Sequence, residues 1–482
     1  MEDVEIRSLA RRSIHGVLIL ISRQFVLNII SFGAFLFVTA ILSPKEIGIF
    51  TAIIAIQRII SFFTDFGFGA ALIQKKDKLT QQDISTTFTL QFGVTLIIFL
   101  LVFLFKDLIA GIFGYSDVGT YLLLSLVFSI FVSSFKTIPA VMLERGINFG
   151  KLVIPQIAES IAFNGLLVIL VVQGFGISSF TWAFLVSSLV GVPFYYMVSP
   201  WGIKFGVYKE SLRHLKFGLQ FQAKSILATI KDDLLTAFLP KFISYAEIGY
   251  IGFAQRLSFF IYRYVVDSLT KVTFSSYSRM QDNKEFLRKA LEKSLFFVGT
   301  TMFPLLVGLM ITIPFIIDYF PKWNNKWEPA VLSVIFFSLN ALVSSVSGVL
   351  VNVLDASGKV TKTLQLMVIW TLLTWVLTPI LIMMFGYNGV ALASFIISLS
   401  IVYTIYLVKK QVEFSIFHPL LKPGIATGIM GLCAYFGGML FVSNIITLIF
   451  VIIFAALVYG VIMYLIAKDE IIQDIQKFIL KR

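Results

Sequence analysis

Hydrophobic positions along this chain are gathered into fourteen long runs, and each run is separated from the next by a short polar or turn-forming segment. An α-helix needs about 20 apolar residues to cross the hydrocarbon core of a bilayer, and each run is near that length. No gap between the runs is long enough to hold a soluble domain. The pattern therefore predicts an all-α integral membrane protein with about 14 transmembrane helices, at residues 14–42, 47–72, 84–105, 118–138, 150–172, 178–198, 216–240, 247–270, 291–318, 328–352, 361–384, 389–408, 421–440 and 444–466.

The composition agrees with a chain that faces lipid on most of its surface. Hydrophobic residues make up 58% of the 482 positions and charged residues only 13%, whereas soluble domains are about 45–50% apolar and about 25% charged. The net charge of +13 comes from short basic clusters between the apolar runs, so we expect no nucleic-acid partner. The single cysteine, Cys433, excludes an intrachain disulfide.

The distribution of lysine and arginine predicts the orientation of the helices. Loops on the cytoplasmic side of membrane proteins carry an excess of positive residues. If there are fourteen helices, 27 of the 39 Lys and Arg residues lie at the termini or in the loops on the same side, and 5 lie in the opposite loops. We therefore expect both termini in the cytoplasm.

An internal repeat predicts how the helices are grouped. The segment Ser43-Pro-Lys-Glu-Ile-Gly48 follows the first predicted helix, and the similar segment Ser244-Tyr-Ala-Glu-Ile-Gly249 follows the seventh. Duplicated bundles around a central cavity are common in secondary transporters. We expect two pseudo-symmetric six-helix bundles at residues 1–215 and 216–410, followed by two extra helices and an amphipathic cytoplasmic tail at 411–482.

Charged side chains within the predicted membrane helices mark the candidate site. Each costs about 2.5–3.5 kcal/mol on insertion scales, so such residues usually face a wet cavity or a charged partner. The cations that we expect to bind substrate in a shared cavity are Arg23, Arg58, Lys224, Lys231, Arg256 and Arg263. The acids that we consider as possible ion-coupling sites are Asp65, Glu159, Asp232 and Asp233.

A cavity lined by these cations suits an anion such as a phosphate or pyrophosphate group. Arg23 and Lys224 have no acidic residue three or four positions away in their own helices, which favours a cavity role for both. The same role is favoured for Arg256. For the remaining cations, neutralisation within the protein is an equally good interpretation: Arg263 by Asp267, Arg58 by Asp65, and Lys231 by its neighbours Asp232 and Asp233.

Other kinds of chemistry have little support in the sequence. His15, His214 and His418 are too scattered to form a metal site, and we find neither a phosphate-binding loop nor a catalytic triad. We therefore expect no metal, no enzyme activity, and no cofactor beyond a possible coupling ion, H⁺ or Na⁺. Trp323 and Trp327 could stack on sugar rings or anchor the chain at the membrane interface.

Three segments of the chain resemble the polysaccharide transporter family of the MOP flippase superfamily. They are Leu42-Ser-Pro-Lys-Glu-Ile-Gly-Ile-Phe50, Asp65-Phe-Gly-Phe-Gly-Ala-Ala-Leu-Ile-Gln-Lys-Lys76 and Glu144-Arg-Gly-Ile-Asn-Phe-Gly-Lys-Leu152. The resemblance implies a MATE-like fold and export of undecaprenyl-pyrophosphate-linked repeat units for O-antigen, capsule or exopolysaccharide. It also implies cavity arginines in helices 1, 2 and 8, which correspond here to Arg23, Arg58 and Arg256.

These observations lead to the hypothesis of a flippase in a bacterial cytoplasmic (inner) membrane. It would translocate lipid-linked oligosaccharides from the inner to the outer leaflet by alternating access, among membrane lipids and alongside a polysaccharide polymerase and glycosyltransferases. One alternative is a multidrug or cation antiporter of the same superfamily, which would need an acidic or apolar cavity. Another is a membrane polysaccharide polymerase or ligase, which would usually need a large outer loop.

Overall fold

The computed structural model describes the backbone of residues 2–65, 69, 72, 73, 75, 77–211 and 229–479, and the side chains of residues 22–62, 64, 69, 72, 73, 75, 77–211 and 229–468. The predictions that fall outside these residues concern Lys224, His214, the boundary at 215/216, the side chains of His15 and Asp65, and the apolar face of the C-terminal tail. The described chain forms two compact units, Met1–Gly249 (unit 1) and Tyr250–Arg482 (unit 2).

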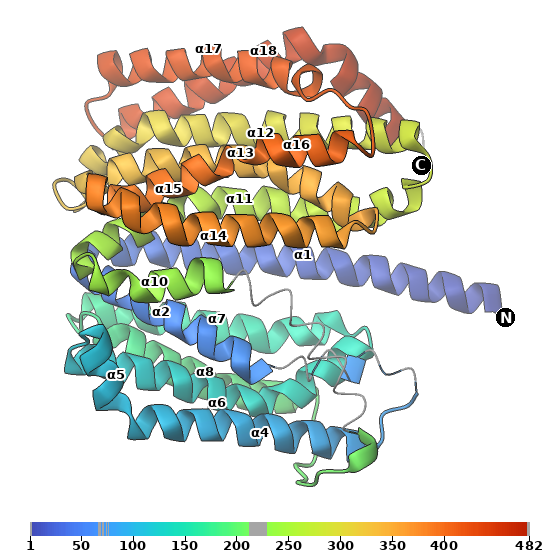
Figure 1. Cartoon of the computed structure of the whole chain (residues 1–482), viewed down its shortest axis with the longest axis vertical. Helices are drawn as coiled ribbons and strands as arrows, with labels where there is room; N and C mark the ends of the chain where they lie inside the picture. Colours follow the sequence, from blue (N-terminus) through green and yellow to red (C-terminus); the bar gives the residue numbers. More distant parts are fainter. Residues whose placement is uncertain are drawn as a thin grey trace. The chain divides into compact units, whose positions relative to one another are not determined.

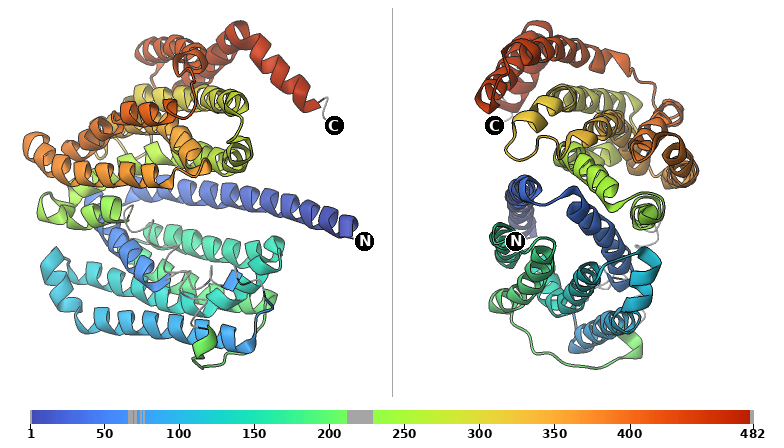
Figure 2. Two further views of the ribbon diagram at one scale, coloured as in Figure 1. Left: turned by 45° about the vertical axis from the view of Figure 1, so that its right-hand side comes forward. Right: turned by 90° about the vertical axis from the view of Figure 1, so that its left-hand side faces the viewer.

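Unit 1 is a bundle of long helices (Figures 1 and 2). In it, α1 packs on α7, α7 on α8, α8 on α6, and α6 on both α4 and α2. Its elements are α1 (Glu2–Ile41), α2 (Pro44–Asp65), α4 (Gln81–Leu104), α5 (Lys106–Phe113), α6 (Asp117–Arg145), α7 (Phe149–Val172), α8 (Ser178–Val198), the π-helix η1 (Ile230–Leu234), α10 (Leu235–Phe238) and η2 (Leu239–Lys241).

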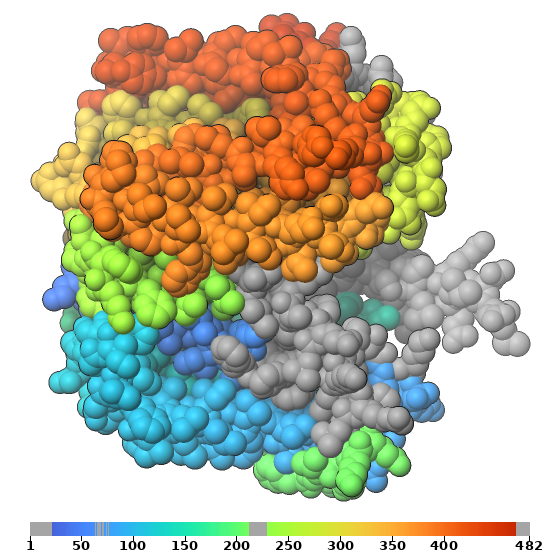
Figure 3. Space-filling view, viewed as in Figure 1, coloured from blue at the N-terminus to red at the C-terminus, as the bar shows by residue number. Residues whose placement is uncertain are grey.

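Unit 2 begins inside a helix that it shares with the end of unit 1. In Figure 3 the helices α14, α15 and α16 cover one face of this unit. The elements are α11 (Tyr245–Met280), α12 (Lys284–Tyr319), η3 (Glu328–Ala330), α13 (Val331–Ala356), α14 (Val360–Phe385), α15 (Asn388–Ser398), α16 (Ile401–Lys409), α17 (Phe417–Phe441) and α18 (Ile445–Ile479). A break in helical geometry at Ala467 separates the membrane part of α18 from the tail.

The predicted all-α membrane architecture is confirmed, while the count of fourteen spans is not. Among the described residues, eleven helical segments are long and apolar enough to cross a bilayer, and each coincides with a predicted span. The predicted spans 47–72, 216–240 and 247–270 are not among the eleven. These three are also the spans that carry most of the charged residues of the predicted site. The division into 1–215, 216–410 and 411–482 stays a prediction.

The two copies of the repeated segment form the same helix cap. In the first, the backbone N–H and the hydroxyl of Ser43 donate to Glu46 Oε2 over 2.8 and 2.7 Å. In the second, Ser244 donates to Glu247 Oε2 in the same way, over 2.7 and 2.8 Å. Each is a capping box, in which a Ser and a Glu three residues later satisfy the first N–H groups of a helix.

The two caps also pack against each other inside unit 1. A Cβ on Gly48 would lie 1.6 Å from the backbone oxygen of Tyr245, and a Cβ on Gly249 would lie 1.9 Å from the backbone oxygen of Pro44. Each glycine therefore lets the backbone of the other cap approach closely. The reciprocal contact is what a local twofold relation between the repeated segments would produce.

Two of the family-like segments also meet in unit 1. Arg145, at the end of α6, donates from Nη1 to the carbonyl oxygens of Leu72 and Lys75 over 2.7 and 2.6 Å, and from Nη2 to that of Asp77. The guanidinium has several donors in a fixed plane, so one side chain can bind several carbonyl groups of a loop. Arg145 thus holds the segment after α2 against the end of α6.

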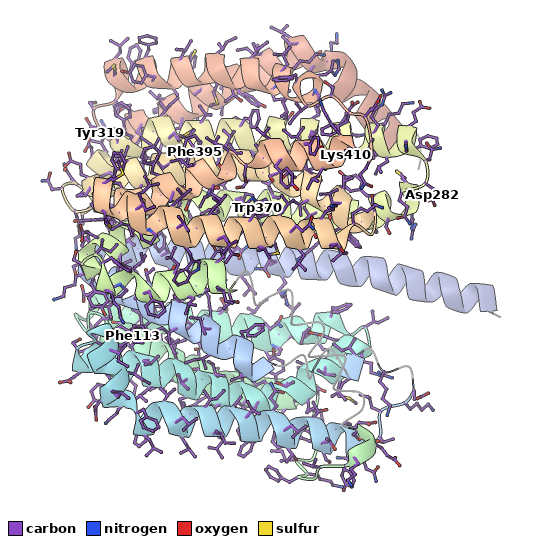
Figure 4. All side chains as sticks on the ribbon, in the orientation of Figure 1. Phe113, Asp282, Tyr319, Trp370, Phe395 and Lys410 are labelled. Atoms are coloured by element: carbon purple, nitrogen blue, oxygen red, sulfur yellow. The ribbon has the colours of Figure 1, made fainter. Side chains whose placement is uncertain are left out.

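The ends of unit 2 differ in the residues they carry. Asp282 and Lys410 lie at one end of this unit, and Tyr319 lies at the other (Figure 4). Near Tyr319, Trp323 and Trp327 are 1% and 0% exposed, and the ring of Trp327 stacks on Phe253 with centroids 4.3 Å apart. Because both indoles are packed inside the protein, they do not present a surface on which a sugar could stack.

Candidate functional site

An open recess of about 400 Å³ lies in unit 1 between α1, α7 and α8. Its wall is mostly polar on the α7 side, where residues at positions i, i+3, i+4, i+7 and i+8 share one helical face. It is lined by Arg23, Leu27 and Ser31 of α1, by Gln156, Glu159, Ser160, Phe163 and Asn164 of α7, and by Phe184 and Ser187 of α8.

Arg23 is the cation of this recess. Its Nη1 donates a hydrogen bond to Oε1 of Gln156 in α7, and its Nη2 donates to Oε1 of Gln24 over 3.3 Å. Its Nε is buried without a hydrogen-bond partner among the described residues. No described carboxylate lies within ion-pair distance of Arg23. The guanidinium is therefore oriented by a neutral amide and keeps donor capacity for a ligand.

The support of Arg23 comes from three helices. Gln156 is held next to the hydroxyl of Tyr195 in α8, and Tyr195 is buried. Glu144, near the end of α6, is half-buried and its carboxylate interacts electrostatically with Arg23. Arg23 is thus placed by packing as well as by its own hydrogen bonds.

A second ion pair lies directly against the recess. Nζ of Lys136 in α6 donates to Oε1 of Glu159 in α7 over 2.6 Å, and the two side chains are only 14% and 25% exposed. We call Lys136 and Glu159 the recess pair. The carboxylate of Glu159 lies against Gly191 of α8, where a Cβ would be 1.6 Å from Oε1. The lack of a side chain at this position is what makes room for Glu159.

Sequence reasoning missed Lys136. The predicted fourth helix ended at residue 138, which placed this lysine at a helix end, where a charge is unremarkable. The structure continues α6 to Arg145, so Lys136 is about 14 Å from the end of the helix at 1.5 Å per residue. A useful signal was available, because Glu159 has no basic residue three or four positions away in α7 and therefore needed a partner from another helix.

The other predicted charges of unit 1 whose side chains the structure describes form two pairs at the π-helix η1. Nη1 of Arg58 in α2 donates to Oδ1 of Asp233 in η1 over 3.1 Å, and the two side chains are 51% and 17% exposed. We call these two residues the α2–η1 pair. Lys231 donates to Oδ1 of its neighbour Asp232 over 2.6 Å. A π-helical turn is rare and frequently marks a functional site.

In unit 2, the predicted cations Arg256 and Arg263 lie on α11, and both side chains are exposed. Arg263 and Lys271 interact electrostatically with Asp267 on the same helix. The structure therefore brings together Arg23 and Glu159 at one recess and Arg58 and Asp233 at one contact. The assignment of all predicted residues to substrate or ion binding stays a prediction.

Comparison with known proteins relates this geometry to a family. Residues 37–332, more than half of the chain, match the family described as "Polysaccharide biosynthesis protein". The chain is similar to the lipopolysaccharide biosynthesis protein WzxC of Escherichia coli (strain K12), with 25% identity over 305 residues. That alignment covers 59% of this chain and 58% of WzxC, so the chain spans less than two thirds of the length of this relative.

Solved structures show the same fold. The lipid II flippase MurJ in an inward closed conformation matches with a TM-score of 0.74 and 22% identity, over 94% of this chain and 100% of MurJ. An inward-facing multidrug resistance transporter of the MATE family in the MOP superfamily matches with a TM-score of 0.61 and 14% identity, over 80% of this chain and 94% of the transporter. The expected MATE-like fold is confirmed.

Proposed function

Because the chain belongs to the polysaccharide biosynthesis protein family, we propose that it is a flippase that moves lipid-linked oligosaccharides across the cytoplasmic membrane. The fold supports this proposal, since it is shared with a lipid II flippase. The similarity to a lipopolysaccharide biosynthesis protein supports a polysaccharide precursor as the cargo. The substrate that we propose is an oligosaccharide linked to undecaprenyl pyrophosphate.

The observation that carries the proposal is that Arg23 lines the open recess without an ion-pair partner among the described residues. A guanidinium with free donors favours an anionic group, because hydrogen bonds between charged groups are stronger than those between neutral groups. The pyrophosphate of the carrier lipid would supply that group, while its apolar chain would remain in the bilayer.

Translocation by alternating access is the mechanism that fits a fold with an internal repeat. The anionic head group would bind at the recess from the inner leaflet and be released at the outer leaflet. The membrane potential would assist, since moving one charge through 100 mV is worth about 2.3 kcal/mol and an anion leaves a negative interior downhill. Coupling to H⁺ or Na⁺ at Glu159, Asp232 or Asp233 would be an additional source of energy.

The rival function is that of a multidrug or cation antiporter. A cationic drug needs an acidic or apolar cavity, and here the one acidic side chain that lines the recess, among the described residues, is paired with Lys136. Among the described residues that line the recess, Arg23 is therefore the charged group without an ion-pair partner. This observation favours an anionic cargo.

The test is a transport assay with full-length protein in proteoliposomes. A labelled polyprenyl-pyrophosphate oligosaccharide is added, and its appearance in the opposite leaflet is followed by accessibility to a membrane-impermeant enzyme. We expect the wild-type protein to move it unchanged and Arg23→Gln to slow it at least tenfold. Glu285→Gln is the matched control, because it alters an exposed Lys289–Glu285 pair on α12. Wild-type rates in Arg23→Gln, with normal insertion, would overturn the role of this arginine.

A further inference from the structure

Glu159 lies between the recess and a second cation. Its side chain lines the recess, and its Oε1 accepts the hydrogen bond from Lys136 Nζ at 2.6 Å. Lys136 itself is not among the residues that line the recess, and its side chain is 14% exposed. The Glu159 carboxylate therefore stands between Lys136 and a ligand in the recess.

The positive charge available in the recess is smaller than the negative charge of a pyrophosphate group. Lys136 and Glu159 neutralise each other, so Arg23 is the cation that remains for a ligand among the described residues. A pyrophosphate group carries more than one negative charge at neutral pH. One guanidinium neutralises only part of this charge, and each unneutralised charge is costly away from bulk water. A second cation close to Arg23 would remove this deficit.

We propose that Lys136 is the second cation of the anion site, and that Glu159 is an internal anion which occupies Lys136 until a phosphate group of the ligand replaces it. The inference rests on the proposed function, since it concerns the same recess. In the empty site, Glu159 satisfies an ammonium that would otherwise be left unpaired within the membrane. When the ligand binds, its phosphate oxygen takes over the hydrogen bond from Lys136 Nζ.

Gly191 and Arg23 define where the exchange takes place. The carboxylate of Glu159 fits against the backbone of α8 because position 191 has no Cβ. Arg23 is bonded to Gln156, which precedes Glu159 by one turn of α7 and faces the same recess. Arg23 of α1 and Lys136 of α6 thus contact residues one turn apart on α7, so one phosphate or pyrophosphate group that displaces Glu159 would meet both cations.

The experiment is a titration of inorganic pyrophosphate into the full-length protein in lipid nanodiscs, followed by calorimetry. We expect Glu159→Gln to bind pyrophosphate about tenfold more tightly than the wild type, because the competing charge is gone. Lys136→Met should bind it about tenfold more weakly. In the double variant Glu159→Gln/Lys136→Met the gain should disappear, since it acts through Lys136. Glu285→Gln, on the surface of α12, should bind as the wild type does.

The outcomes separate this inference from the proposed function. If Arg23→Gln weakens binding but Glu159→Gln leaves the affinity unchanged or lowers it, the anion site stands and the exchange at Lys136 is wrong. If the wild type and Arg23→Gln bind pyrophosphate equally, the anion site itself is wrong. Should Glu159→Gln fail to fold, Glu159→Asp decides, because it keeps the charge but draws the carboxylate away from Lys136. If Glu159→Asp binds pyrophosphate more tightly than the wild type, by a smaller factor than expected for Glu159→Gln, the exchange is supported. An affinity equal to that of the wild type contradicts the exchange.

Discussion

Two ion pairs of unit 1 use the same chemistry in different surroundings. The recess pair, Lys136 and Glu159, is only 14% and 25% exposed and is confined by Gly191. In the α2–η1 pair, Arg58 is 51% exposed and Asp233 17%. By the proposal above, Lys136 meets a ligand only after its carboxylate moves, whereas Arg58 is half-exposed while it is paired. Availability to a ligand is therefore set by burial and packing, and not by the presence of a partner.

The difference also bears on stability. A buried pair is costly to break, because the partner that remains is an uncompensated charge, whereas an exposed pair contributes little. Breaking the recess pair should therefore lower the free energy of unfolding more than breaking the α2–η1 pair. The following substitutions test this contrast, in order of decreasing effect.

Lys136→Met should have the largest effect, because it leaves Glu159 charged and without its ammonium partner. We expect the free energy of unfolding in detergent micelles to fall by about 3 kcal/mol, at the lower end for a broken buried pair because Glu159 lines an open recess. The double variant Lys136→Met/Glu159→Gln should recover most of this loss. Equal stability of the single and the double variants would contradict the account of the pair.

Gly191→Ala should have an intermediate effect. The added Cβ would lie 1.6 Å from Oε1 of Glu159, so the carboxylate must leave its position or α8 must shift. Overpacking of this kind costs about 2 kcal/mol, measured as a loss in the free energy of unfolding. In a Glu159→Ala background the same substitution should cost little. If the cost is the same in both backgrounds, the glycine is needed for another reason.

Arg58→Gln should have a small effect on stability, about 0.5 kcal/mol, because the arginine is half-exposed. Asp233→Asn should give a similar value, measured by the same unfolding titration. A loss as large as that of Lys136→Met would show that the two pairs do not differ, and would remove the contrast drawn here.

Glu285→Gln gives the lower limit of the series. This residue forms an exposed pair with Lys289, one turn away on α12, at 2.7 Å. Exposed pairs of this type contribute little to stability, and their contribution decreases in high salt. A measured loss larger than that of Arg58→Gln would mean that Glu285→Gln is not a neutral reference and that the series needs another one.

Much of the fold could be predicted from hydrophobic periodicity. A helix that faces lipid must be apolar over about 20 residues, so its position can be predicted from hydropathy alone. Of the three spans outside the eleven apolar segments, 47–72 and 216–240 lie partly outside the described residues. The third, α11, is described in full and carries several charged residues, so its hydropathy marks the span less clearly.

The candidate site was predicted only in part. Arg23 was singled out because no acidic residue lies three or four positions away in its own helix, and it lies in the recess. Glu159 was selected as an acid inside a helix, and it lines the same recess. Its partner Lys136 was not found, because pairing between helices depends on which faces meet in space. The same limit applies to Arg58, whose partner is Asp233 in another helix and not a residue of its own.

The reciprocal contact of the two helix caps has a consequence for the evolution of the chain. Gly48 lies against the backbone of Tyr245, and Gly249 lies against that of Pro44, so neither glycine can be exchanged alone without moving the other cap. Selection on the two positions is therefore coupled, because a side chain at either one would displace the backbone of the other cap. In a library that randomises both positions at once, we expect selection for surface glycan to return glycine at each.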